Sequence, residues 1–199
     1  MAEPPLTDAQ LIARVIVHDD RHAFSELVRR HQSAVRATLR RLTAGNHALA
    51  DDLAQETFML AYRNLESFRQ EARFSTWLYR IATNAYLAHA RKRKEELLGD
   101  RDAEIAAGED GLDAEPSGAE EADHAHAATL RMDMDRALAV LSEGERAAIV
   151  QCYHNDLSHE EAAVVLNCPV GTVKTHILRA KQKLRSQLAA WAPDGRSAR

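Results

Sequence analysis

The sequence predicts an all-α protein of two small helical domains joined by a flexible acidic linker. Apolar residues recur at three- and four-residue steps in both halves of the 199-residue chain, which is the spacing of one buried helix face. Hydrophobic residues make up 45% of the chain and aromatic residues only 5%, a composition suited to helices packed on aliphatic cores. Residues 96–128 between the halves have too few apolar side chains to offset their ordering entropy. We therefore place the domains at 1–95 and 129–199.

The first half predicts four helices, three of which precede a loop. Thr7 and Asp8 can cap a short helix, and a second helix has one apolar stripe that runs from Phe24 to Leu42. Gly45 interrupts that pattern, and a third helix with leucines on one face ends before Glu66. Each of these helices has a single buried face, which predicts a small bundle.

A loop and a fourth helix complete the first half. Residues 67–74 contain charged and aromatic side chains without periodicity, so we expect a loop there. Ser75 can cap the helix that follows, which turns Trp77 and Leu78 inward and runs out into the basic segment Arg91–Lys94.

The second half has clearer helix boundaries. Ser142 with Glu145 and Ser158 with Glu161 have the spacing of capping boxes, in which each side chain satisfies a free backbone N–H of the first turn. The second box opens a short helix, and a long helix follows after a tight turn that contains Pro169. Two helices joined by so tight a turn predict a helix-turn-helix.

Charge is distributed unevenly along the chain, although the net charge is only −4. Residues 1–94 hold 15 Lys and Arg against 10 Asp and Glu, a net charge of +5. Residues 95–128 hold 1 against 12, a net charge of −11, and residues 129–199 hold 10 against 8, a net charge of +2. Two basic halves flank an acidic strip, so the overall charge does not exclude a nucleic-acid partner.

The long last helix combines a narrow apolar seam with a cationic remainder. The seam consists of Val173, Ile177, Ala180 and Leu184. No acid occurs over residues 170–185, so the rest of the helix suits a phosphate backbone and a major groove. The alternative is an ordinary solvated face with basic residues toward the C-terminal end. The short helix and tight turn before it favour DNA.

The segment 68–94 interleaves aromatic rings with arginines. Such rings can stack on unpaired bases while the cations hold the strand. The simpler alternative is that Phe74 and Trp77 anchor the core, and we favour it for Trp77. For Phe68 and Asn84, on a loop and on an expected exposed face, we favour contact with nucleic acid.

Two parts of the chain resemble regions of a known family. The stretches Asp51–Phe58 (DDLAQETF) and Phe74–Asn84 (FSTWLYRIATN) resemble region 2 of the extracytoplasmic-function sigma factors, which are promoter-recognition subunits of bacterial RNA polymerase. The stretch Pro169–Lys181 (PVGTVKTHILRAK) resembles their region 4. With the acidic connector between them, the resemblance spans nearly the whole chain in the family's order.

The resemblance implies three contact surfaces. The residues matched to the surface that grips the clamp helices of the polymerase largest subunit are Asp51, Asp52, Gln55, Glu56 and Phe58. The residues matched to minus-10 contacts, including the pocket for a flipped base, are Phe68, Arg69, Phe74, Trp77, Arg80, Asn84, Arg91 and Arg93. The residues matched to minus-35 contacts are Thr172, Lys174, Thr175, His176, Leu178 and Arg179.

The implied function is that of a sigma factor which binds core RNA polymerase, recognises both promoter elements and opens the DNA. The implied partners are core polymerase, through its clamp helices and flap, promoter DNA and an anti-sigma factor. The chain departs from the family at His159, where tyrosine is frequent, at Ala162, where a larger aliphatic is usual, and at Thr175-His176, where serine and arginine are common. These departures bear on which promoter is read.

Two other classes of function remain open. A sigma-like mimic that titrates an anti-sigma factor should lose the cationic helix face and the aromatic loop, and the sequence has both. A stand-alone helix-turn-helix regulator would explain residues 129–199 and would bind duplex DNA tightly without polymerase. It leaves the stretches before residue 95 without a role.

The sequence predicts no cofactor, no metal site and no enzymatic activity. The spacing of Cys152, His154, His159 and Cys168 matches no zinc-ligand pattern, and we expect the two cysteines to be reduced thiols. No phosphate-binding, dinucleotide-binding or metalloprotease motif occurs. No stretch reaches the ~20 apolar residues of a membrane span, and the N-terminus lacks a signal-peptide pattern, so we expect a cytoplasmic protein with no membrane insertion.

Overall fold

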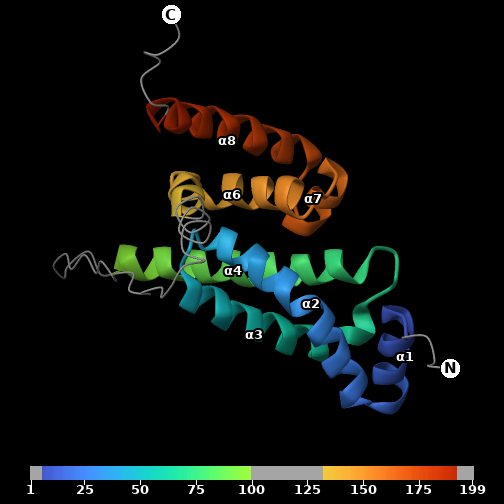
Figure 1. The fold of residues 1–199 in the computed structure, drawn as a ribbon. Coiled ribbons are helices and arrows are strands. Elements are labelled where there is room, and N and C mark those ends of the chain that lie inside the picture. The colour runs from blue at the N-terminus through green and yellow to red at the C-terminus, as the bar shows by residue number, and fades with distance from the viewer. Residues whose placement is uncertain (1–5, 100–131, 192–199) are drawn as a thin grey trace, which may run out of the picture.

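The computed structural model describes residues 6–99 and 132–191 (Figure 1). Within these ranges all regular elements are helical, which confirms the all-α prediction. The predicted linker lies outside the described residues except for 96–99, which continue the preceding helix.

The front half is a bundle of four helices: α1 (Asp8–His18), α2 (Arg21–Leu42), α3 (His47–Arg63) and α4 (Phe74–Gly99). Thr7 caps α1 in a capping box with Gln10, as its position predicted. The stripe predicted for α2 is confirmed, since Leu27, Val35 and Leu39 are buried in the core. The core of this half lies where α2, α3 and α4 meet.

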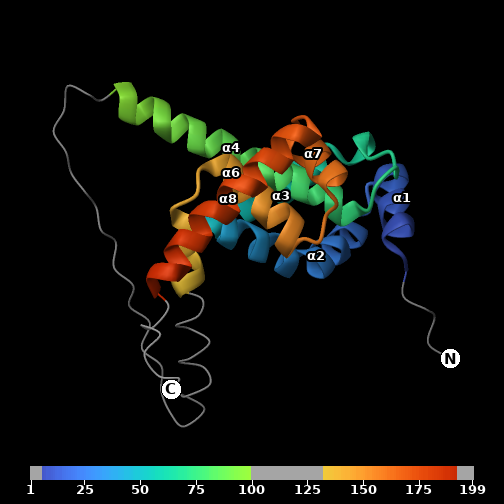
Figure 2. The same ribbon diagram turned by 90° about the horizontal axis from the view of Figure 1, so that it is seen from above.

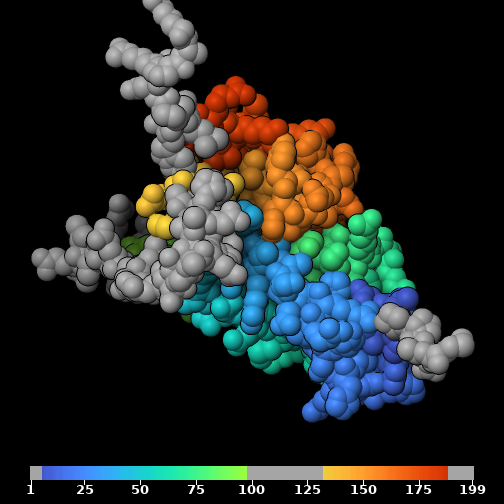
Figure 3. All heavy atoms as spheres, in the orientation of Figure 1, coloured from blue at the N-terminus to red at the C-terminus, as the bar shows by residue number. Residues whose placement is uncertain are grey.

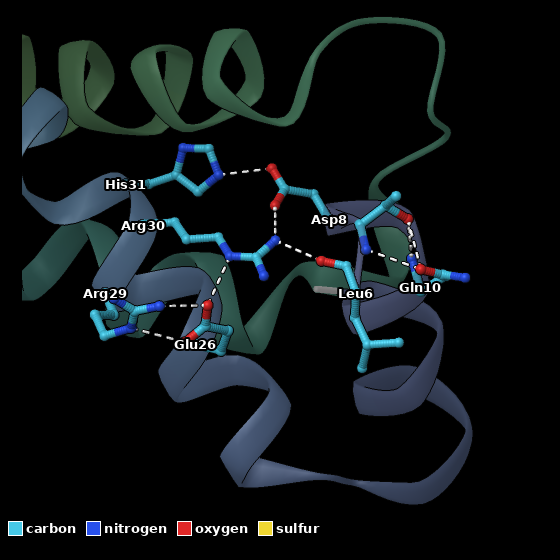
Figure 4. A network of polar contacts seen from close by, with 8 residues as sticks. Leu6, Asp8, Gln10, Glu26, Arg29, Arg30 and His31 are labelled. Carbon is cyan, nitrogen blue, oxygen red and sulfur yellow. Dashed lines mark hydrogen bonds and ion pairs between the residues drawn. The ribbon is translucent and has the colours of Figure 1, made fainter. Parts of the chain in front are cut away.

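A polar network fastens α1 to α2 (Figure 4). Asp8 accepts from Arg30 Nη1 at 3.1 Å and lies 2.7 Å from His31 Nε2. Glu26 accepts from both Arg29 and Arg30, and these two guanidinium groups lower the pKa of Glu26 to about 2. The network holds a three-turn helix that would be marginal in isolation.

Two predicted boundaries in the front half are wrong by a few residues. The third helix ends at Arg63, and a 3₁₀ turn, η1 (Leu65–Ser67), follows it. The fourth helix begins at Phe74, and Trp77 N–H bonds to the Arg73 carbonyl, so Ser75 lies inside the first turn and is not its cap. Leu65, just after the end of α3, and Phe74, at the start of α4, are both buried against the core, which fixes the chain at these two boundaries.

The rear half has a helical segment over 132–139, then α6 (Glu143–Ile149), the π-helical turn η2 (Val150–His154), α7 (His159–Leu166) and α8 (Val170–Trp191). Both predicted capping boxes, at Ser142 and Ser158, are present. Asn167 takes the left-handed conformation that ends α7, with φ of 49°. The π turn has no local signal in the sequence.

The two halves pack directly against each other in the part of the chain that the structure describes. In Figure 1, α6 and α7 lie on α2 and α4, while α8 covers the side of α6 and α7 that faces away from the front half. The view in Figure 2 agrees, and the space-filling view in Figure 3 shows the rear half seated on the front half. Ala147 and Val150 of the rear half belong to the front half's buried core.

Candidate functional site

Three aromatic rings gather where the loop after η1 enters α4. The ring centroid of Phe68 lies 5.4 Å from that of Phe74 and 5.5 Å from that of Trp77, and the last two rings stack at 5.6 Å. Phe74 is buried, whereas Phe68 and Trp77 are half-buried at the edge of the core. Phe74 thus anchors the core, and Phe68 and Trp77 are the rings that lie within reach of a ligand.

The cationic and polar residues beside this cluster point outward. Arg69 lies on the loop and is exposed, and so are Arg80 and Asn84 one turn apart on α4. The C-terminal turns of α4 project beyond the bundle in Figure 2. They carry exposed Arg91 and Arg93. The helix therefore continues the aromatic cluster with an exposed basic edge, as a single strand would require.

A hollow joins the basic end of α4 to the start of α3. Its lining residues are Asn46, Leu49, His89, Lys92, Arg93 and Glu96. Lys92 pairs with Glu96 at 3.7 Å, so the charge nearest the hollow is partly neutralised. Arg93 also lines the hollow and is exposed.

The predicted polymerase-binding residues on α3 divide into two sets. Asp52, Gln55 and Glu56 are exposed on one helix face. Asp51 instead has its buried Oδ1 atom 3.5 Å from Arg36 Nε, so this carboxylate pairs within the front half. Phe58 packs against the core, on the side of α3 that faces the bundle.

Sequence reasoning missed Met59, which belongs to the same surface. Met59 follows Asp52 by seven residues and Gln55 by four, so the three side chains share one face. Its exposed fraction is 56%, which leaves a large apolar side chain among polar ones. We call the face of Asp52, Gln55, Glu56 and Met59 the α3 face. The sequence feature that could have indicated Met59 is its helical spacing from Asp52 and Glu56.

The turn between α7 and α8 is a helix-turn-helix, and α8 buries the predicted seam. Val173, Ile177 and Ala180 are buried and Leu184 is half-buried. Lys174, Thr175, Leu178 and Arg179, predicted to read bases, are all exposed near the start of the helix. Lys181 lies over the Tyr153 ring at 4.9 Å, which holds one more cation on this face.

Thr172 and His176 do not share the exposed face. Thr172 is half-buried in the first turn, where its N–H donates to the Pro169 carbonyl. The His176 ring lies against Gly144 of α6, and its Nδ1 is buried without a hydrogen bond. Of the six predicted minus-35 residues, His176 therefore faces the interior of the rear half, because α6 passes directly over it.

The two cysteines lie in the small core of the rear half. Cys152 and Cys168 are half-buried, unpaired thiols packed on the same cluster, and burial raises the pKa of both. A raised thiol pKa disfavours the reactive thiolate. In the described ranges, no helix combines the length and apolar character needed to cross a bilayer.

Comparison with known proteins connects both halves to one family. Residues 27–96 match the family model of sigma-70 region 2, and residues 131–184 match that of sigma-70 region 4. The ECF RNA polymerase sigma factor SigW of Bacillus subtilis is 37% identical over 173 residues, which cover 85% of this chain and 90% of the relative. The ECF RNA polymerase sigma-E factor of Escherichia coli is 35% identical over 186 residues, covering 92% of this chain and 95% of the relative.

Two solved structures share the fold. The sigma factor RpoE, in a co-crystal with the anti-sigma factor NepR from Bartonella quintana, gives a TM-score of 0.64 at 28% identity, covering 83% of this chain and 96% of that one. CnrH, in complex with the cytosolic domain of CnrY, also gives a TM-score of 0.64, at 26% identity, covering 92% of this chain and 97% of that one.

Proposed function

The chain belongs to the sigma-70 family, in its extracytoplasmic-function group, and on this premise we propose that it binds core RNA polymerase, recognises minus-35 and minus-10 promoter elements and opens the DNA. The observation that carries the proposal is the presence of both family regions, in order, in one chain. It acts as an initiation factor in the cytoplasm and not as an enzyme. Residues 1–95 and 129–199 serve as the two DNA-reading parts, with 96–128 connecting them.

The front half accepts the opened strand. Phe68 and Trp77 offer half-buried ring faces on which an extruded base can stack, and Arg80 and Asn84 lie exposed on the same helix. Arg91 and Arg93 supply positive charge for the phosphates further along α4. The extruded base thus contacts the rings of Phe68 and Trp77, and the phosphate backbone of the strand contacts the arginines further along α4.

The rear half reads the minus-35 element through the exposed start of α8. Lys174 and Arg179 are long donors at positions from which a recognition helix reaches base edges. Thr175 and Leu178 lie between them and can contact the groove. The modest net charge of this half predicts weak binding to duplex DNA without polymerase.

The α3 face is the proposed contact for the polymerase clamp helices. Exposed carboxylates suit a partner that presents arginines, and Met59 adds apolar area at their centre. The flap is the second polymerase contact, made by the rear half. Because the similar RpoE and CnrH chains were solved with an anti-sigma factor or with CnrY, we also propose a protein inhibitor for this chain.

Reconstitution of core polymerase with the purified chain tests the proposal. Promoter-selective transcription is expected, and Lys174→Ala or Arg179→Ala should each weaken minus-35 discrimination by about 1–3 kcal/mol if the residue makes a bidentate base contact. Arg185→Ala is the matched control, because it removes one charge from the same helix three turns beyond Lys174 and should weaken all sequences alike.

Other outcomes would point to the other functions. Tight binding to duplex DNA without polymerase, and no selective transcription with it, would identify a stand-alone regulator. Capture of an anti-sigma factor without any transcription would identify a titrating mimic.

A further inference from the structure

Tyr153 is an exposed aromatic residue that lies outside the three predicted contact surfaces. Its exposed fraction is 54%, and it lies in the π-helical turn η2. Tyr153 follows buried Val150 by three residues and half-buried Ile149 by four, so a regular α-helix would turn all three side chains inward. Hydrogen bonds of a π turn span five residues, as from the Asn155 N–H to the Val150 carbonyl at 3.1 Å, so Tyr153 is rotated outward. The π turn thus accounts for the exposure of this ring.

One flank of α8 is covered by the start of α6. His176 and Lys183 are seven residues apart and therefore share this flank, beside the buried seam. Gly144 lies against the His176 ring, and Glu145 Oε2 lies 2.7 Å from Lys183 Nζ. The first turn of α6 thus fixes which flank of α8 faces the interior of the rear half.

The other flank of α8 is exposed, and Tyr153 lies at its edge. The residues of this flank recur at steps of four, three and four and are all exposed: Lys174, Leu178, Lys181 and Arg185. Lys181 Nζ lies 4.9 Å from the centroid of the Tyr153 ring. The segment from α6 to η2 therefore crosses α8 and ends on the flank that contains two of the predicted minus-35 readers, Lys174 and Leu178.

The Tyr153 ring holds a cation without neutralising it. Lys183 pairs with the Glu145 carboxylate, which cancels its charge. Lys181 instead lies over a ring that attracts the ammonium through its quadrupole but has no net charge. No acid occurs over residues 170–185. Lys181 therefore has both a fixed position and its full positive charge, which suits an anionic ligand.

The Tyr153–Lys181 pair lies at the distance from the base readers at which a phosphate backbone is expected. Lys181 follows Lys174 by seven residues, which is about 10 Å along the helix axis. The major groove is about 12 Å wide, and the first residues of a recognition helix contact its base edges. A pair nearly one groove width further along α8 reaches the rim, where the phosphates lie. Tyrosine hydroxyls and lysine ammonium groups both donate to phosphate oxygens in protein–DNA complexes.

We propose that Tyr153 and Lys181 together bind one backbone phosphate of duplex DNA beside the minus-35 element. The Tyr153 hydroxyl donates one hydrogen bond, and the Lys181 ammonium donates a second, charge-assisted one. The contact carries no sequence information but fixes the depth and orientation of α8 in the groove. The proposal rests on the proposed sigma-factor function and adds to it a phosphate contact from outside the recognition helix.

Tyr153→Phe in the full chain is the first test, because phenylalanine keeps the ring under Lys181 and removes only the hydroxyl. With core polymerase and a promoter fragment that the wild-type chain selects, affinity should fall about two- to tenfold, which is the loss of one hydrogen bond. The loss should be equal on fragments with intact and altered minus-35 sequences, because a phosphate contact does not read bases. Unchanged affinity would overturn the proposal and leave Tyr153 as a packing contact for Lys181.

A scan with neutral methylphosphonates locates the phosphate. Each phosphate around the minus-35 element is replaced in turn, and the affinity lost is compared between the wild-type chain and Tyr153→Phe. At one phosphate the loss should be about two- to tenfold smaller for Tyr153→Phe, and at the others the two chains should lose equally. Equal losses at every phosphate would contradict a direct contact from Tyr153.

Lys181→Met tests the charge, with Lys183→Met as the matched control on the same helix. The slope of log affinity against log salt should be reduced by about 0.9 for Lys181→Met, because one phosphate contact is lost. Lys183→Met should keep the wild-type slope, because that ammonium lies against Glu145 on the covered flank. Equal slopes for the two variants would remove Lys181 from the contact and overturn the pair.

A random-sequence duplex separates this inference from the proposed function. If the wild-type chain with core polymerase selects no promoter, the proposed function fails. The phosphate contact is then measured with the full chain alone at low salt, because phosphate contacts do not depend on sequence. Weaker binding of Tyr153→Phe to this duplex would support the pair, and equal binding would overturn it. Reduced affinity of Tyr153→Phe for core polymerase, with unchanged binding to the duplex, would make Tyr153 a protein contact and would also overturn the proposal.

Discussion

Lys183 Nζ lies 2.7 Å from Glu145 Oε2 and joins the middle of α8 to the first turn of α6. Glu145 also completes the capping box with Ser142. Burial alone would raise the pKa of Glu145, but the bonds from Lys183 and from Ser142 N–H outweigh it and hold the pKa below its ordinary value. The geometry supports a lowered pKa, because the Glu145 carboxylate accepts hydrogen bonds from both the Lys183 ammonium and the Ser142 backbone N–H.

Glu145→Gln should therefore lower stability in a pH-dependent way. A depressed pKa in the folded state contributes stability that is present above pH 4.5, the ordinary value, and is lost as pH falls below it. We expect a loss of about 1 kcal/mol at pH 7, since glutamine keeps the cap but loses the ion pair. Chemical denaturation at pH 7 and pH 3.5 measures it, and a difference that does not shrink between pH 7 and pH 3.5 would contradict the assignment.

Gly144→Ala should destabilise the rear half only while His176 is present. An added Cβ would lie 3.0 Å from the His176 ring, which is half-buried and would have to shift to make room. In a His176→Ala background the same change should stabilise by about 0.5–1 kcal/mol, the helix propensity gained from glycine to alanine. A double-mutant cycle from denaturation midpoints measures the coupling. Additive effects of the two substitutions would show that the ring moves aside freely.

Local signals explain what the sequence could predict. The boxes Ser142–Glu145 and Ser158–Glu161 act over three residues, so sequence spacing alone locates both helix starts. The α8 seam followed from helical periodicity for the same reason. The exposure of Lys174, Thr175, Leu178 and Arg179 could be predicted in the same way, because helix positions outside the apolar seam face solvent unless another element covers them.

The remainder depended on contacts between distant residues. Gln151 and Thr83 are 68 positions apart, and nothing near either one indicates that they meet. The position of His176 in the last helix predicts a DNA-facing side chain, but Gly144 of α6 lies against its ring. Asp51 looked equivalent to Asp52, but Arg36 of another helix pairs with only the first. Helix faces could be predicted from periodicity, whereas the neighbour of each face required the fold.

Met59→Ala should weaken capture by core polymerase without altering the fold. Met59 is 56% exposed, so its truncation costs little in the free chain. Loss of its apolar area from an interface core is worth about 1 kcal/mol, or roughly a fivefold lower affinity. Met134→Ala is the matched control, because Met134 is 47% exposed on a helical segment outside the α3 face. Titration of labelled chain with core enzyme measures both, and equal affinities for the two variants would remove Met59 from the interface.

Phe68→Ala should slow promoter opening while polymerase binding stays intact. The ring is half-buried and contacts both Phe74 and Trp77, so its loss removes a stacking surface for an extruded base. It also removes two aromatic contacts worth about 0.5–1.5 kcal/mol each, which lowers stability. Phe24→Ala separates the two effects, because Phe24 is likewise half-buried and makes an edge contact to Tyr62 at 4.9 Å away from the DNA surfaces. Permanganate reactivity of the minus-10 thymines, followed in time, should fall for Phe68→Ala alone, and an equal delay for both variants would reduce Phe68 to a packing role.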